Sequence, residues 1–287
     1  MRFSLNEIRK HKIRNKKKGL REPSGLTLDY DRAALWTVCD DDRIKRLFKL
    51  SLSGELDDSE SFSVDEGNLE GIAHGENADV LYAVQESRED DSGRTRKNAL
   101  LKYSIANRQR LSRARLMDMR GFEEQLQQYF FPEEISDKER DEQLRKGLEG
   151  LCLNTKTNTL FALKEGVPGI LIEISLDLGE VLRHWVLDGR DFSTDKVAAE
   201  KVDYSGICFY PRRNGFFIVS DKAAHIYFYD AANHTVDGAA QLTFEGKPVR
   251  KAEGVAVDDR TDEVYVVSDD DGELLVYQLS WDDPPEP

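Results

Sequence analysis

The chain of 287 residues has little of several features that often reveal function. Its three cysteines, Cys39, Cys152 and Cys208, form neither a CxxC pair nor any metal-ligand spacing, which excludes the common cysteine-based metal sites. No stretch is long and apolar enough to span a membrane, and residues 1–20 contain no apolar run typical of a signal peptide. We therefore expect a cytoplasmic protein with no membrane span.

Common catalytic motifs and an excess of positive charge are also missing. The sequence has no phosphate-binding glycine loop, no GxSxG motif and no HExxH motif. It contains 41 Lys and Arg residues against 55 Asp and Glu residues, a formal net charge of -14. Because duplex nucleic acid requires a basic surface, this composition disfavours it as a partner.

What the sequence does contain is a repeat. A short motif, in which a glycine follows Ser or Glu and precedes an apolar residue, occurs five times, at Gly25, Gly71, Gly150, Gly206 and Gly254. Eleven residues after each glycine there is an aromatic residue, in the order Trp36, Tyr82, Phe161, Phe217 and Tyr265. An offset that is held five times predicts a repeat protein.

Each repeat has the pattern of four antiparallel strands. A strand after the glycine is followed by a polar turn, a second strand with the aromatic residue, a third strand and a weaker fourth strand. This pattern predicts an all-β fold, a single β-propeller domain over residues 1–287 with blades that begin near residues 22, 69, 148, 204 and 252. We expect five blades; the alternative is six, with a degenerate blade in the second spacing.

The two ends of the chain are expected to complete the ring. The last repeat stops after three strands, near Trp281. An open sheet edge is unfavourable, so we expect residues 2–8 to supply the missing strand and to close the propeller.

The second spacing between repeat glycines contains an insertion. It measures 79 residues, whereas the other spacings measure 46, 56 and 48 residues. Residues 121–147 include an apolar run at 122–131, a break at Pro132 and a capping-box pattern formed by Ser136 and Glu139. This arrangement predicts two short helices.

Strand direction divides the expected propeller into two faces. The face where the innermost strands begin, here called the loop face, would also carry the loops after the second strands, at residues 40–42, 85–97, 164–165, 221–222 and 269–271. It would carry the helical insertion as well. The opposite face, here called the turn face, would carry only tight turns. Because binding residues concentrate on long loops, we expect function on the loop face.

The residues before the five repeat glycines are candidate metal ligands: Ser24, Glu70, Glu149, Ser205 and Glu253. Equivalent positions in a closed ring converge on its axis, where three carboxylates repel one another unless they are protonated or neutralised. An oxygen-only donor set suits Ca²⁺ better than Zn²⁺. We therefore expect one axial Ca²⁺. The alternative is that these side chains only hydrogen-bond the backbone at the strand starts.

Several of these motifs resemble known propellers. Leu-Glu-Gly-Ile-Ala at 69–73 and Ala-Glu-Gly-Val at 252–255, among others, resemble the SdiA-regulated family over roughly residues 20–280, which implies a calcium-binding propeller. More distantly, the chain is similar to calcium-activated nucleotidases, five-bladed propellers whose axial ligands occur in the order Ser, Glu, Glu, Ser, Glu. That similarity implies nucleotide binding over the calcium, and residues 38–41 resemble an acidic segment of that family. Calcium-dependent phytase-like propellers are a looser comparison.

Two classes of function remain open. In the first, the protein is a calcium-stabilised binding module whose loop face holds a small molecule or a protein. In the second, it is a calcium-dependent phosphohydrolase of nucleotidase or phytase type. Its candidate residues would be Asp40, Asp41 or Glu86 to orient water and Arg43, Arg88, Lys164 or Lys222 to hold phosphate. Acids outnumber bases on the loop face, which favours the binding module.

Overall fold

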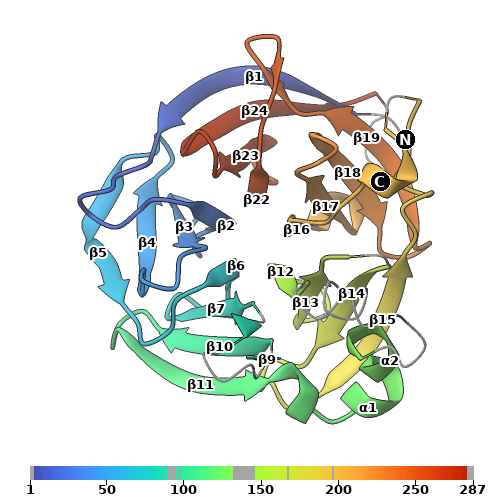
Figure 1. The fold of residues 1–287 in the computed structure, drawn as a ribbon. Helices are drawn as coiled ribbons and strands as arrows, with labels where there is room; N and C mark the ends of the chain where they lie inside the picture. The colour runs from blue at the N-terminus through green and yellow to red at the C-terminus, as the bar shows by residue number, and fades with distance from the viewer. Residues whose placement is uncertain are drawn as a thin grey trace.

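The computed structural model of the protein describes residues 3–86, 98–131, 146–166, 168–195 and 197–282, together with the backbone of residues 88–89 and 95–96. Five four-stranded antiparallel sheets surround a common axis, as Figure 1 shows. This arrangement confirms the predicted all-β propeller with five blades rather than six.

The blades follow one another along the chain, and each of the first four begins with its innermost strand. Blade 1 comprises β2 (Pro23–Leu28), β3 (Ala34–Cys39), β4 (Arg46–Ser51) and β5 (Leu56–Ser63). Blade 2 comprises β6 (Leu69–His74), β7 (Val80–Gln85), β10 (Ala99–Ser104) and β11 (Gln109–Arg115). Blade 3 comprises β12 (Leu148–Asn154), β13 (Thr159–Lys164), β14 (Gly169–Ile174) and β15 (Val181–Leu187).

The remaining blades complete the ring. Blade 4 comprises β16 (Gly206–Tyr210), β17 (Gly215–Ser220), β18 (His225–Asp230) and β19 (Thr235–Gln241). Blade 5 comprises β22 (Ala252–Asp258), β23 (Glu263–Ser268), β24 (Glu273–Trp281) and, from the other end of the chain, β1 (Phe3–Lys12). Two short hairpins lie outside the blades, β8 (Arg88–Glu89) with β9 (Thr95–Arg96) and β20 (Thr243–Phe244) with β21 (Lys247–Pro248). Within the described ranges no helix is long and apolar enough to cross a membrane.

The N-terminal strand closes the ring as predicted, and it is longer than predicted. β1 pairs with β24 in antiparallel register from Phe3 opposite Trp281 to Lys12 opposite Glu273, and it covers the outer side of blade 5 in Figure 1. The ring of Phe3 packs against Trp281, with centroids 5.3 Å apart. Closure therefore combines a strand pairing with an aromatic contact.

The hydrophobic core is divided into five clusters, one between each pair of neighbouring blades. Each of the five repeat aromatic residues belongs to a different cluster. Each also stands opposite the residue two positions after a repeat glycine, as Tyr82 stands opposite Ala73. The large ring fits because its cross-strand neighbour is small. This neighbour is a cysteine or an alanine in four blades and Thr27 in blade 1. The repeat aromatic residues therefore join the blades.

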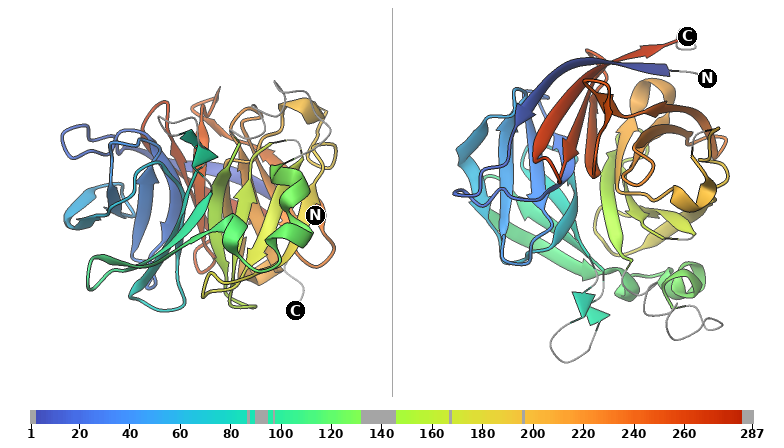
Figure 2. Two further views of the ribbon diagram at one scale, coloured as in Figure 1. Left: turned by 60° about the horizontal axis from the view of Figure 1, so that its bottom comes forward. Right: turned by 45° about the horizontal axis from the view of Figure 1, so that its top comes forward.

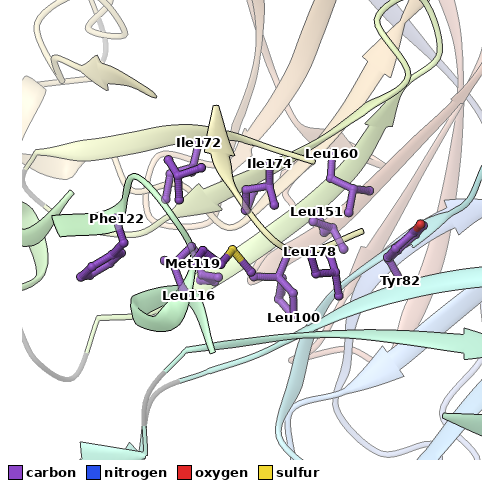
Figure 3. Close-up of a cluster of buried hydrophobic side chains, with 14 of the residues drawn as sticks. Tyr82, Leu100, Leu116, Met119, Phe122, Leu151, Leu160, Ile172, Ile174 and Leu178 are labelled. Atoms are coloured by element: carbon purple, nitrogen blue, oxygen red, sulfur yellow. The ribbon is translucent and has the colours of Figure 1, made fainter. Parts of the chain in front are cut away.

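The insertion packs against the ring. After the short 3-10 helix η1 (Leu116–Asp118), it contains α1 (Phe122–Gln125) and α2 (Gln127–Phe130), at the rim of the ring in Figure 2. Figure 3 shows Met119 and Phe122 beside Ile172 in the cluster between blades 2 and 3. The apolar run thus forms two single-turn helices, and the further helix predicted after Pro132 lies outside the described residues.

Candidate functional site

The five repeat glycines form a closed circle of contacts around the axis, here called the glycine ring. A Cβ atom on Gly25 would lie 2.5 Å from the carbonyl oxygen of Glu70 in the next blade. One on Gly254 would lie 2.5 Å from the carbonyl oxygen of Ser24, and the other three glycines likewise abut the inner strand of the following blade. Glycine is required because the inner strands approach one another through their backbones.

The glycine ring brings the five predicted metal ligands to one level of the axis. Ser24 lies on β2, Glu70 on β6, Glu149 on β12 and Glu253 on β22, and Ser205 directly precedes β16. The side chains of Ser24, Glu70 and Ser205 are buried, and the other two residues are partly buried. The five residues therefore occupy equivalent places at the starts of the inner strands, and their convergence on one cation stays a prediction.

The three glutamates, here called the axial carboxylates, are strongly desolvated. Burial raises the pKa of Glu70 well above its ordinary value, and the neighbouring Glu149 adds to the shift. Burial also raises the pKa of Glu149, with a further contribution from Glu86. Burial followed by the charge of Asp221 raises the pKa of Glu253 to about 8. Without a cation, these groups favour the protonated form.

Both serines hydrogen-bond the next blade. The Ser24 hydroxyl lies 2.9 Å from both the carbonyl oxygen and Oε2 of Glu70. The Ser205 hydroxyl donates to the carbonyl oxygen of Ala252 at 2.7 Å. These contacts match the alternative in which the side chains bond the backbone at the strand starts, and they hold neighbouring inner strands together.

The donor chemistry of this level fits a hard divalent cation. Three desolvated carboxylates and two hydroxyls supply only oxygen, the atom that Ca²⁺ prefers. Among the described residues, no ion pair joins Glu70 or Glu149 to a lysine or an arginine. In the same part of the chain, no three His, Cys, Asp or Glu side chains are already gathered into a metal-binding group. The five ligands therefore stay a prediction that the donor set supports.

A second set of acids surrounds the axial carboxylates. The residue fifteen positions after every repeat glycine is acidic, and we call this set the outer acidic ring: Asp40, Glu86, Glu165, Asp221 and Asp269. The charges of Asp40 and Glu86 raise the pKa of Glu70, and those of Asp221 and Asp269 raise the pKa of Glu253, after burial in both cases. The shared offset of fifteen residues from the repeat glycines could have been found in the sequence. So could Asp203, a further nearby acid, which stands two residues before Ser205.

Several candidate catalytic residues are engaged in other contacts. Asp41 accepts hydrogen bonds from Arg43, with Nε at 2.9 Å from Oδ1 and Nη2 at 2.8 Å from Oδ2. These hydrogen bonds hold the pKa of Asp41 below its ordinary value. Lys222 lies 3.4 Å from Glu165 and 3.5 Å from Asp203. The side chain of Arg88 lies outside the described residues.

Lys164 is buried rather than exposed at the mouth. Its side chain is 1% exposed, its Nζ atom donates to the carbonyl oxygen of Glu165 at 2.9 Å, and it lies 5.2 Å from the ring centroid of Phe130. Burial lowers its pKa to about 8. A phosphate at the loop face would meet a covered amine here rather than an exposed one.

Among the cavities outside the axial carboxylates, two bear on function. One, of about 430 Å³, lies on the loop face between blades 3 and 4 and is lined mainly by apolar groups, including Val186, Leu187, Val202 and Tyr204. The other, of about 540 Å³, lies at the turn face on the axis. The connections at the turn face are short, as expected, and the inner strands leave a hollow there beyond the glycine ring.

Comparison with solved structures shows the propeller fold in proteins of different function. Glutaminyl cyclase from Myxococcus xanthus superposes with a TM-score of 0.62 at 14% identity, covering 98% of this chain and 99% of that chain. The β-propeller domain of Cps50 (Swd1) from Myceliophteria thermophila has a TM-score of 0.52 at 8% identity, covering 96% and 100%. Aldose sugar dehydrogenase from Streptomyces coelicolor has a TM-score of 0.50 at 12% identity, covering 97% and 98%. At these identities the likeness concerns the fold alone.

The sequence comparison is more specific. No curated protein is significantly similar to the chain. A family model does match residues 5–272, which include the glycine ring, the axial carboxylates and all of blades 1 to 4. The chain belongs to the SdiA-regulated family.

Proposed function

We propose that the protein is a calcium-dependent binding module, in which one Ca²⁺ on the axis stabilises the ring and the loop face holds a small molecule or a protein partner. The observation that carries this proposal is the desolvation of Glu70, Glu149 and Glu253 at one level of the axis. Three desolvated carboxylates repel one another when they are ionised, and a divalent cation would remove both the repulsion and the need for protonation.

The residues would act in different ways. Glu70, Glu149 and Glu253 would supply charged oxygen ligands, and Ser24 and Ser205 would supply neutral ones. The outer acidic ring adds to the negative potential at the mouth and would attract a cation from solution. Bound Ca²⁺ would supply charge neutralisation and would hold the inner strands of the five blades together.

The ligand of the module is expected at the loop face beside this centre. The cavity between blades 3 and 4 has apolar walls, with Val186 among the exposed large hydrophobic side chains of the protein. Apolar concave surfaces with a few polar groups are typical of small-molecule sites. This cavity supports a ligand-binding role for the face that the sequence indicated.

The phosphohydrolase alternative has less support. It needs bases that hold phosphate, yet Lys164 is buried, Arg43 is paired with Asp41, and Lys222 lies near two acids. The outer acidic ring would also repel a phosphate that is not already neutralised. The binding module therefore stays the preferred function.

Calcium titration by isothermal calorimetry tests the proposal. The natural protein should bind one Ca²⁺, Glu149→Gln should lose this binding, and Glu123→Gln, which removes an exposed carboxylate in α1, should keep it. Phosphate release from nucleotides and inositol phosphates should be absent with calcium and with chelator. Absence of calcium binding by folded protein would contradict the module, and calcium-dependent phosphate release lost in Glu149→Gln would establish the hydrolase instead.

A further inference from the structure

The turn-face cavity is a built feature of the repeat. It has a volume of about 540 Å³ and is lined by residues of all five blades. Four of its lining residues occupy the position two residues after a repeat glycine: Thr27, Cys152, Cys208 and Ala256. Small side chains at this position leave space between the inner strands, whereas at the glycine ring these strands contact one another through their backbones. We call this cavity the cup.

The wall of the cup is apolar in part and polar in part. The position three residues after the repeat glycine contributes Leu28, Leu153, Phe209 and Val257. The two cysteine thiols are free, and burial raises the pKa of Cys152 and of Cys208, so both stay neutral. These side chains favour contact with an apolar part of the molecule that fills the cup.

The charged groups of the rim already have partners within the protein. The pairs are Asp29 with Lys49 at 3.9 Å, Glu76 with Lys102 at 3.1 Å and Arg32 with Asp258 at 3.4 Å. A charged ligand would lose its hydration without meeting an uncompensated charge of opposite sign. The rim therefore favours an uncharged molecule.

One side of the rim presents an aromatic ring and a hydrogen-bond acceptor. The side chain of Tyr30 is 55% exposed, and its ring centroid lies 5.8 Å from that of the buried His74. His74 Nδ1 faces the carbonyl oxygen of Gly75 at 3.4 Å, which requires the proton on Nδ1 and leaves Nε2 as an acceptor. Burial lowers the pKa of His74, so the ring is neutral at pH 7.

We propose that the turn-face cavity binds a planar, uncharged aromatic or heteroaromatic molecule. Its flat face would stack on Tyr30, and its N–H or O–H group would donate to Nε2 of His74. Aromatic stacking and one directional hydrogen bond, in a cavity with both apolar and polar walls, favour selective binding of a small molecule. This site lies on the opposite side of the glycine ring from the proposed calcium ligands and does not depend on the metal.

Indole and N-methylindole are the probes, because they differ only at the N–H group. Saturation-transfer NMR and a fluorescence or dialysis titration should show that indole binds the natural protein at least five-fold more tightly than N-methylindole. Benzoate and benzylammonium should bind less than indole. Tyr30→Ala, which changes an exposed side chain, should weaken indole binding about ten-fold, and His74→Leu should abolish the difference between the two indoles.

Matched variants separate this site from the loop face. Phe131→Ala removes an aromatic side chain of the insertion that is 37% exposed and should leave indole binding unchanged. Glu149→Gln should also leave indole binding unchanged, because the turn-face site does not require calcium. Failure of the calcium proposal would therefore not contradict the proposed indole site. Absence of indole binding by folded natural protein would overturn the proposal, and so would equal affinity for the two indoles or unchanged binding in Tyr30→Ala. The comparison of the two indoles needs no variant and stands if His74→Leu does not fold.

Discussion

The hydroxyl of Ser24 lies 2.9 Å from both the carbonyl oxygen and Oε2 of Glu70, and it thereby joins the inner strand of blade 1 to that of blade 2. The two residues are 46 positions apart in the chain and occupy equivalent places in successive repeats. Two predicted metal ligands from neighbouring blades are thus in direct contact.

Ser24→Ala should destabilise the protein and weaken calcium binding. The buried carbonyl of Glu70 loses a donor, which lowers the free energy of unfolding by about 1 kcal/mol. Urea denaturation measures this change, and calorimetry measures calcium affinity. Ser193→Ala is the control, because the exposed Ser193 hydroxyl also donates to a backbone carbonyl, that of Arg190 at 2.7 Å. Equal effects of both variants would show that Ser24 has no special role.

Removal of calcium should lower the melting temperature of the natural protein. A ligand present at about 100 times its Kd adds about 2.7 kcal/mol to the free energy of unfolding, which corresponds to a shift of roughly 5 °C for a chain of this size. Differential scanning calorimetry with calcium and with chelator measures the shift. Glu149→Gln should melt at the same temperature in both conditions, and a natural protein that does so would exclude an axial calcium.

The calcium-free protein should lose stability as the pH rises from about 5 to 8.5. Burial raises the pKa of Glu253 to about 8, above its unfolded value, so the folded state holds a proton that the unfolded state has released. This contribution is complete below the unfolded pKa and is lost as the pH passes the folded pKa. Urea midpoints at several pH values should fall across this window, and Glu253→Gln should flatten the curve. A flat curve for the natural protein would contradict the raised pKa.

Gly25→Ala should destabilise the ring strongly. The added Cβ atom would lie 2.5 Å from the carbonyl oxygen of Glu70 and 2.7 Å from the backbone of Gly71. Because backbone atoms cannot move aside, we expect a loss of at least about 3 kcal/mol or failure to fold, visible in urea denaturation. Gly179→Ala is the control, since its new Cβ atom would meet only the Asp177 side chain, at 3.3 Å. Equal stability of the two variants would disprove the tight ring.

Closure by the N-terminal strand should depend on Phe3. Its side chain is 6% exposed and packs on Phe217 and Trp281, with centroids 5.4 Å and 5.3 Å apart. Phe3→Ala should lower the free energy of unfolding by about 3 kcal/mol. Ile8→Ala changes a side chain on the same strand that is 42% exposed, and it should lower stability by less than about 1 kcal/mol. Thermal melts of both variants decide whether the contact stabilises the ring.

The blades could be predicted from local pattern because one strand pairing repeats five times. The fixed offset from Gly71 to Tyr82 reflects a hairpin. In it Ala73, two residues after the glycine, stands opposite the ring of Tyr82. The closing strand could be predicted as well, since the last repeat ends at Trp281 with one strand missing. The bounds of the insertion were less predictable, because its short helices follow the packing of Met119 and Phe122 between two blades.

The candidate site depended more on tertiary structure. The sequence pattern did not predict the pairing of Asp41 with Arg43 or the burial of Lys164 under Phe130. The residue type of a charged loop position does not reveal whether its side chain is exposed or buried. The turn-face cavity was missed for a similar reason, since a small residue such as Cys152 is read equally well as packing and as the lining of a hollow.

The sequence by itself determined the five-fold repeat, the strand order and the chemical types gathered at each level of the axis, because these follow from periodicity along the chain. Only the tertiary structure decided which of those groups are desolvated, which are paired and where space remains. Desolvation and cavities arise from contacts between blades distant in sequence, as in the contact of Gly254 with Ser24, and such contacts exist only once the ring is closed.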